Sequence, residues 1–184
     1  MLRLLPLIGS GLVTVATVLF SGTATAEFVI KQVSAQLAAD ELRVSAEVDL
    51  RLSNEAQAAL ENGVPLVVLT EIEVLKPGAF WDETLVKREL RSRLRYHALS
   101  DRYVIEREEQ GTGMESFRSV GNALRQLGKI RNVEIPVNTL PADTLLAVRS
   151  SLDINALPAP LRPMALFSAN WRLSSDWTQW QIAR

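Results

Sequence analysis

Two glutamates, Glu71 and Glu73, stand two positions apart in an apolar segment that runs from Leu66 to Leu75. In a strand, residues two apart lie on the same face, so both carboxylates would point to one side of a sheet. Neighbouring carboxylates can share a calcium ion or divide the acid and base roles of hydrolysis. No other residues of the sequence converge on this pair, and we therefore expect no catalytic residue and no cofactor.

The chain has one histidine, His97, and no cysteine. A metal site built from two or three imidazoles is excluded, as are thiolate metal sites and disulfides. A catalytic triad would have to use His97, yet the sequence lacks the G-x-S-x-G pattern of a nucleophile elbow. These features favour a protein that is not an enzyme.

A basic stripe shares one strand parity in the segment before Ser100: Lys87, Arg91, Arg93, Arg95 and His97. Such a stripe can dock lipopolysaccharide, anionic lipid or an acidic protein. In the alternative, a hairpin turn centred on Ser100-Asp101 places Arg95 opposite Glu106 and Arg93 opposite Glu108. Cross-strand pairs of this kind would neutralise half of the stripe, and we favour this ion-paired, solvated face.

Three tryptophans gather in the C-terminal tail: Trp171, Trp177 and Trp180. Exposed indoles can stack sugars or hold apolar peptide side chains, whereas buried indoles are core. Trp177 and Trp180 have opposite strand parity, so we expect one of them, Trp177, to stay near the surface. Trp171, Leu161 and Leu173 are expected to be buried.

Arg162 lies in a proline-rich loop, between Pro160 and Pro163. Its planar head can bind an anion or donate to backbone carbonyls inside the fold. We favour the internal role because polar groups in a packed loop need internal donors.

Strict alternation of apolar and polar residues over Leu42–Leu52 predicts a strand with one buried face. Further strands are expected at Phe28–Leu37, Leu66–Leu75, 85–99, 103–105, Val133–Val137, Leu145–Leu152 and, once or twice, Leu166–Ile182. Short helices are expected after Ser53 or Asn54 and after Ser116, the second ending at Gly128. Between them, Gly111-Thr112-Gly113 fits a hinge better than a phosphate-binding loop.

Short strands separated by turns predict a mainly β fold: an antiparallel β-sandwich, immunoglobulin-like or similar, with one or two short helices. Pro136 marks an edge strand or the end of a strand in Val133–Val137, because proline cannot donate to the ladder. An exposed edge can accept a strand from a partner.

The first 26 residues have the order of a secretory signal: Arg3, an apolar run from Leu4 to Phe20, and Ala24-Thr25-Ala26. We expect cleavage after residue 26 and one periplasmic domain over 27–184, with no transmembrane segment once the signal is removed. The alternative is an uncleaved anchor that tethers the domain to the inner membrane. Twenty basic and 21 acidic residues give no general attraction to nucleic acid.

Three stretches together, 94–104, 116–130 and 160–180, resemble a family of exported Gram-negative bacterial proteins described only as domain of unknown function 4390. The resemblance covers essentially all of the chain after residue 26. It implies one envelope domain, with no activity, cofactor or catalytic residues to carry over.

The sequence therefore predicts a non-enzymatic periplasmic interaction or ligand-sensing module whose partner is an envelope or inner-membrane protein. Its candidate binding residues are Arg91, Arg93, Arg95, Arg162, Trp177 and Trp180. One alternative is an assembly accessory that acts by edge-strand addition. Another is an envelope enzyme that uses Glu71 and Glu73.

Overall fold

The structure is a computed structural model that describes residues 27–38, 40–108, 113–137 and 139–182. The expected signal peptide and most of the glycine-containing hinge, Gly111 and Thr112, lie outside these residues. The strands are β1 (Phe28–Ala38), β2 (Glu41–Leu50), β3 (Leu66–Lys76), β4 (Glu83–His97), β5 (Arg102–Arg107), β6 (Met114–Phe117), β7 (Lys129–Pro136), β8 (Leu145–Leu152) and β9 (Thr178–Gln181). The helices are α1 (Asn54–Glu61), α2 (Val120–Leu127), α3 (Arg162–Phe167) and the 3-10 turns η1 (Ile154–Ala156) and η2 (Ala169–Trp171).

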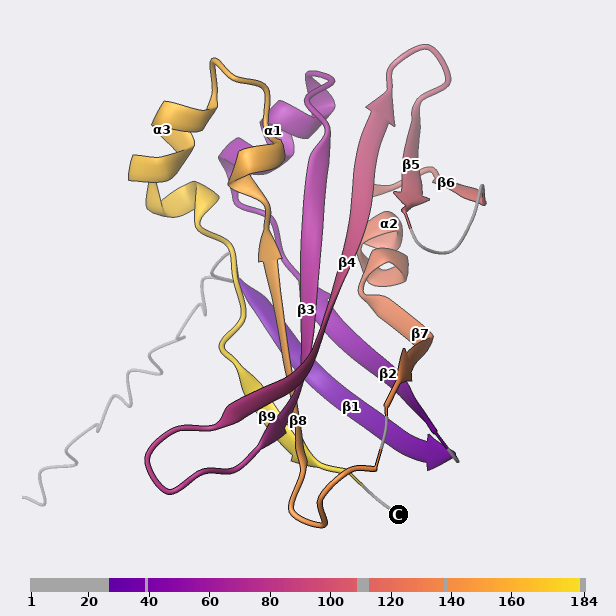
Figure 1. Cartoon of the computed structure of the whole chain (residues 1–184). Helices are drawn as coiled ribbons and strands as arrows, with labels where there is room; N and C mark the ends of the chain where they lie inside the picture. The colour runs from indigo at the N-terminus through magenta and orange to yellow at the C-terminus, as the bar shows by residue number, and fades with distance from the viewer. Residues whose placement is uncertain (1–26, 39, 109–112, 138, 183–184) are drawn as a thin grey trace, which may run out of the picture.

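The strands form two antiparallel sheets. The smaller has the order β1-β2-β7 and the larger the order β6-β5-β4-β3-β8-β9. In Figure 1 the smaller sheet lies behind the larger, and its strands run obliquely to β3 and β8. The predicted mainly β, antiparallel fold is confirmed, with three and six strands where an immunoglobulin constant domain has four and three.

The core lies between the two sheets and follows the period-two pattern of their strands. On β2, the apolar residues Leu42, Val44, Ala46, Val48 and Leu50 are all buried. They meet Ile72 and Val74 of β3 in one hydrophobic cluster that also includes Leu146 and Val148 of β8. The alternation predicted for this segment is confirmed, because every second side chain of a pleated strand points to the same side.

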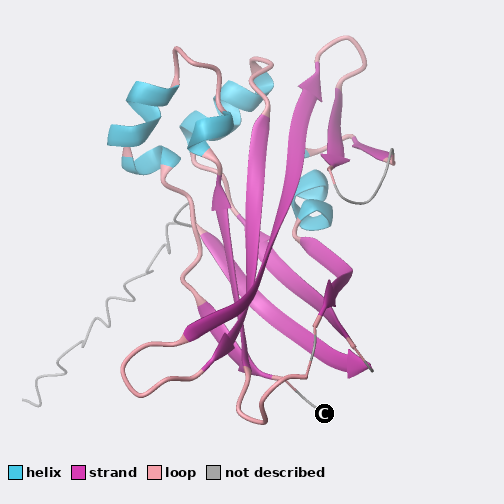
Figure 2. Ribbon diagram, viewed as in Figure 1, coloured by secondary structure: helices cyan, strands magenta, loops and turns pink. Residues whose placement is uncertain are grey.

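In Figure 2 the helices all lie in the upper half of the molecule, with α1 and α3 at one end of the sheets and α2 at one side. Ser53 caps α1 as expected: its Oγ accepts from the backbone N–H of Ala56 at 3.1 Å, and Gly63, with φ of 86°, follows the helix. The cap predicted for α2 was wrong, since Ser119 and not Ser116 accepts from the first turn. Ser116 instead pairs with Val104, because 114–117 form the short edge strand β6.

The C-terminal segment departs most from expectation. The tail predicted as one or two strands begins with α3 and η2, so the described chain has three short α-helices instead of one or two. Trp171 and Leu173 are buried as expected, but Leu161 is only half-buried because it stands at the N-cap of α3. Beyond η2 the chain returns to the sheet, where Leu173 and Ser175 bond the backbone of β8 and β9 completes the edge.

Candidate functional site

The outer face of the six-stranded sheet carries the residues that the sequence singled out. On β3, Ile72 and Val74 point into the core, so Glu71 and Glu73 point outward, on one face as predicted. The β3–β4 register sets Glu89 opposite Glu71 and Lys87 opposite Glu73. The strand pairing therefore brings acids and a base together on a surface that no other element covers in Figure 1.

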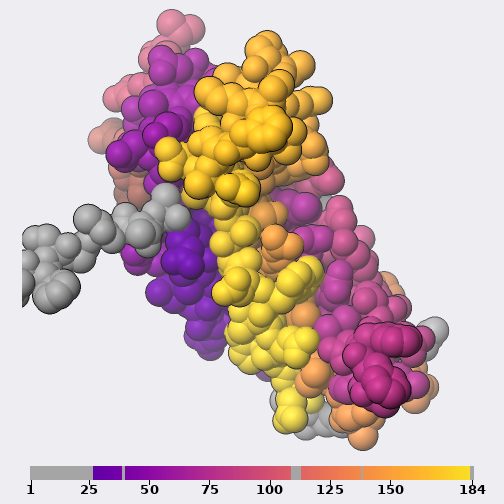
Figure 3. Space-filling model, turned by 90° about the vertical axis from the view of Figure 1, so that its left-hand side faces the viewer, coloured from indigo at the N-terminus to yellow at the C-terminus, as the bar shows by residue number. Residues whose placement is uncertain are grey.

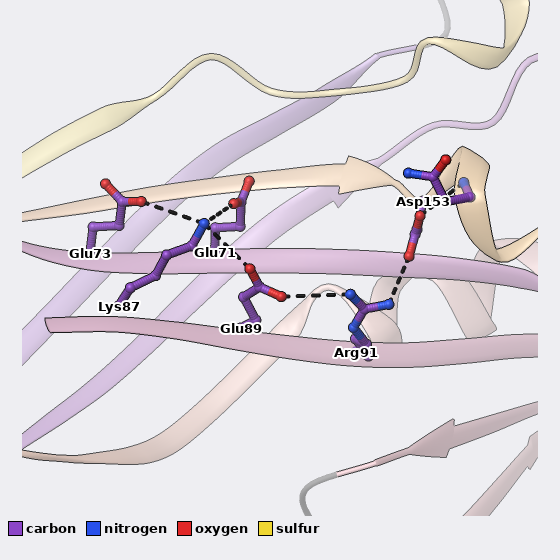
Figure 4. Close-up of polar contacts among 7 residues, drawn as sticks. Glu71, Glu73, Lys87, Glu89, Arg91 and Asp153 are labelled. Atoms are coloured by element: carbon purple, nitrogen blue, oxygen red, sulfur yellow. Dashed lines mark hydrogen bonds and ion pairs between the residues drawn. The ribbon is translucent and has the colours of Figure 1, made fainter. Parts of the chain in front are cut away.

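These side chains form a connected charged ladder, which we define as Glu71, Glu73, Lys87, Glu89, Arg91 and Asp153 (Figure 4). Lys87 Nζ lies 2.8 Å from Glu71, 3.3 Å from Glu89 and 3.8 Å from Glu73. Arg91 continues the ladder, with one nitrogen 3.6 Å from Glu89 and another 2.9 Å from Asp153. The ladder thus crosses from β3 to β4 and reaches the end of β8.

The electrostatics of the ladder keep the ammonium of Lys87 charged. The hydrogen bond to Glu71 raises the pKa of Lys87 above its usual value, while burial of the ammonium opposes the shift. The protonated Lys87 stands between Glu71 and Glu73, where a shared calcium ion or a transferred proton would have to act. Among the described residues, no group of three or more histidine or acidic side chains is placed to hold a metal ion.

The basic stripe continues from the ladder along β4. The turn predicted at Ser100-Asp101 gave a β4–β5 register that is wrong by two residues. The chain turns over four residues, 98–101, with Asp101 at φ 51°. Arg93 therefore lies opposite Glu106 instead of Glu108. A shift of two residues keeps each side chain on the same face of the sheet. The expected ion pairs therefore still form, but between diagonal neighbours on β4 and β5 and not between directly opposite residues. Arg93 lies 3.7 Å from Glu106 and 3.8 Å from Glu108, and Arg95 also pairs with Glu106.

Trp177 borders the same face. Its indole is 40% exposed and lies under the guanidinium of Arg149, whose carbon is 6.0 Å from the ring centroid. Trp180 points to the other side of β9 and is half-buried against the core. The expectation that Trp177 stays nearer the surface is confirmed.

The two remaining candidates lie apart from the ladder. Arg162 donates from Nε to the carbonyl of Leu157 at 2.7 Å, which is the internal role favoured for it. His97 is exposed at the end of β4, about 26 Å along the strand from Glu89 at the usual strand rise. The structure therefore does not bring His97 or Arg162 to Glu71 and Glu73.

Sequence reasoning missed two polar residues that tie neighbouring segments to the six-stranded sheet. The Asp153 side chain is 8% exposed, pairs with Arg91 and caps η1 by accepting from the N–H of Asn155 at 3.0 Å. The sequence held a local indication of this role, because aspartate is a common residue at the N-cap of a helix. Arg107 points inward from β5 and donates to the Gln126 carbonyl at 2.8 Å, which ties α2 to the sheet; burial lowers its pKa.

A second missed feature is the loop between β3 and β4. The chain leaves β3 at Lys76, passes through Pro77-Gly78 and enters β4 at Glu83. The aromatic pair that follows, Phe80 and Trp81, is strongly exposed. Its signal was two large aromatic residues directly after a proline-glycine turn, away from any strand periodicity.

Fold and site together define a mainly β protein with an uncovered, charge-paired sheet face. Within that class, the family model described as Domain of unknown function (DUF4390) matches residues 25–181. The chain belongs to this family, and the resemblance noted in the sequence is confirmed. Comparisons with curated proteins and with solved structures find no match. In the part of the chain that the structure describes, no helix is long and apolar enough to cross a membrane.

Proposed function

We propose that this chain is an exported, non-enzymatic interaction module of the bacterial envelope, and that it binds an envelope or inner-membrane protein through the outer face of its six-stranded sheet. The charged ladder is the observation that carries the proposal. Its acids and bases are held in fixed positions by mutual pairing, across three neighbouring strands (Figure 4). A complementary protein surface can read such a fixed pattern of charge.

Stability alone does not account for the ladder. Half of its side chains are substantially exposed, with 43% of Lys87, 41% of Glu89 and 42% of Arg91 open to solvent. Exposed ion pairs contribute little to folding stability. Arg149 and Trp177, stacked at the border of the ladder, are the residue types that most often dominate the energy of protein interfaces.

The two alternatives find less support. β7 lies at the edge of its sheet as expected, but its register shifts opposite Val44–Ala46, Asn132 has φ of 48°, and Pro136 ends the strand. Such irregularities hinder the addition of a further strand. For an envelope enzyme, Glu71 and Glu73 would have to act while both contact Lys87.

Photo-crosslinking in cells tests the proposal. A photoreactive amino acid at Trp177 should yield one protein adduct, whereas the same amino acid at Gln32, which lines the outer face of the smaller sheet, should not. Charge reversal of Arg91 and Arg93 to glutamate should abolish the adduct. Arg43→Glu, on the smaller sheet, is the matched control that should leave it intact.

Equal adducts from Trp177 and Gln32, or an adduct that survives charge reversal, would show that the outer face is not the binding surface. Adducts formed mainly from positions on β7 would support strand addition instead. A Glu71→Gln chain that loses an envelope hydrolysis, with its adduct intact, would support the enzyme.

A further inference from the structure

Large apolar side chains are exposed at two places on one side of the molecule. The β3–β4 loop carries Phe80 and Trp81, which are 91% and 80% exposed, and α3 presents three more. In Figure 1 both the loop and α3 extend to the left of the sheets, and Figure 3, which views that side, shows both. We call this set the apolar side: Phe80, Trp81, Met164, Leu166 and Phe167.

Packing within the chain does not explain these side chains. Phe80 and Trp81 contact each other, with ring centroids 6.2 Å apart, and remain open to solvent. In α3 the small Ala165 is buried while the larger Met164, Leu166 and Phe167 are exposed. This is the reverse of the usual amphipathic helix. Apolar residues exposed in groups mark an interaction surface.

The chain enters the fold from the same side. β1 begins there, between α3 and the β3–β4 loop (Figures 1 and 3). In the sequence, only Ser21–Ala26 separate Glu27 from the apolar run Leu4–Phe20, which is expected to enter the cytoplasmic membrane during export. Six residues span at most about 20 Å. Any chain whose apolar run stays in the membrane would therefore hold this side close to the bilayer.

We propose that the apolar side rests on the periplasmic surface of the cytoplasmic membrane, with the Phe80–Trp81 tip and the exposed residues of α3 in the interfacial layer. Tryptophan favours this layer because its ring is apolar and its N–H is polar. Two separate apolar projections suit a flat lipid surface better than one protein pocket. This proposal concerns a different surface from the charged ladder and stands independently of the partner proposed there.

Apolar burial, and not attraction to anionic lipid, would drive the contact. The charges beside the tip are Lys76, Asp82 and Glu83, with Lys76 Nζ 3.9 Å from Glu83. This group is acidic on balance, and anionic headgroups attract basic segments. Binding to phosphatidylcholine vesicles and to vesicles that contain phosphatidylglycerol should therefore be similar.

Fluorescence quenching tests the proposal on the protein as the cell exports it. Vesicles of phosphatidylethanolamine and phosphatidylglycerol with brominated acyl chains should quench part of the tryptophan emission, and Trp81→Phe should remove that quenched part. This readout reports Trp81 itself, so it applies whether or not the signal is cleaved. If the signal is cleaved, the double variants Phe80→Ser/Trp81→Ser and Leu166→Ser/Phe167→Ser should each weaken vesicle binding about tenfold.

Leu99→Ser is the matched control, because Leu99 is fully exposed at the β4–β5 turn, away from the apolar side, and should bind vesicles as the unaltered chain does. Unquenched Trp81 emission, or double variants that bind normally, would overturn the proposal. A photoreactive group at position 81 that captures a protein in cells, without quenching by vesicles, would assign the apolar side to a protein. Adducts from Trp177 are scored separately, so failure here leaves the proposed function untouched.

Discussion

Trp171 and Trp177 occupy opposite environments in the same C-terminal segment. Trp171, at the end of η2, is 2% exposed and belongs to the core, whereas Trp177 lies on the surface against Arg149. A buried indole removes a large apolar area from water, while an exposed cation–π pair contributes only about 0.5–1 kcal/mol. The same residue type therefore serves stability at one position and is available for binding at the other.

Truncation should separate these roles. Trp171→Ala should lower the free energy of unfolding by about 3–5 kcal/mol, the range for removing a large buried aromatic side chain. Trp177→Ala should lower the melting temperature by no more than about 4 °C and weaken the capture of the partner. Denaturant unfolding and crosslinking yield, measured on both variants, check this. If Trp177→Ala unfolds the domain, its indole belongs to the core.

At the scale of elements, α2 contains Gly121 and ends at the cap residue Gly128, and these two glycines have different roles. Gly121 lies inside the helix, and a Cβ there would have nothing within 4 Å. Gly128 follows the helix with φ of −70°, so it needs no unusual backbone angle. A Cβ at Gly128 would overlap the carbonyl of Val48, whose own N–H donates to the Gly128 carbonyl at 2.9 Å. The close approach of α2 to β2 therefore requires glycine at 128.

Alanine at the two positions should act in opposite directions. Gly121→Ala should stabilise the protein by about 0.5–1 kcal/mol, because glycine loses more chain entropy on folding than alanine does. Gly128→Ala should destabilise it by about 1–3 kcal/mol, the typical cost of forcing extra volume into a packed site. Chemical denaturation of both variants gives the two values. If both substitutions changed the free energy of unfolding in the same direction and by the same amount, α2 would not pack against β2 as described.

At the scale of the whole molecule, three surfaces have different compositions. The outer face of the six-stranded sheet is charged and paired, the apolar side carries Phe80 and α3, and β7 is an irregular edge. Our proposals place a partner on the first and a membrane on the second. They are geometrically compatible, because the apolar side and the outer face lie on different sides of the molecule in Figure 1.

Export should be visible at the N-terminus. Protein isolated from the periplasm should begin at Glu27, because Ala24-Thr25-Ala26 has the small residues that signal peptidase requires. Mass spectrometry of the N-terminal peptide measures this directly. A full-length chain retained in the inner membrane would instead establish the tethered form and keep the apolar side next to the bilayer.

The sequence by itself determined the elements whose signals are local. Alternation over Leu42–Leu52 predicted β2 and its buried face, although β2 ends at Leu50, and the cap expected at Ser53 or Asn54 predicted the start of α1. These features depend on residues that are only a few positions apart in the sequence, so a short segment is enough to predict them. The same local parity placed Glu71 and Glu73 on one face and left Trp177 nearer the surface than Trp180.

Only the tertiary structure decided which charges meet. The turn at 98–101 shifted the hairpin register by two residues, and Asp153 entered the ladder from the end of β8, far along the chain from Arg91. Register and long-range pairing result from many weak contacts across the whole core, which no short segment contains. For the same reason α3 was missed: Pro163 in its first turn is a weak signal, its exposed apolar residues carry no helical periodicity, and its packing beside η1 and η2 is visible only in the fold.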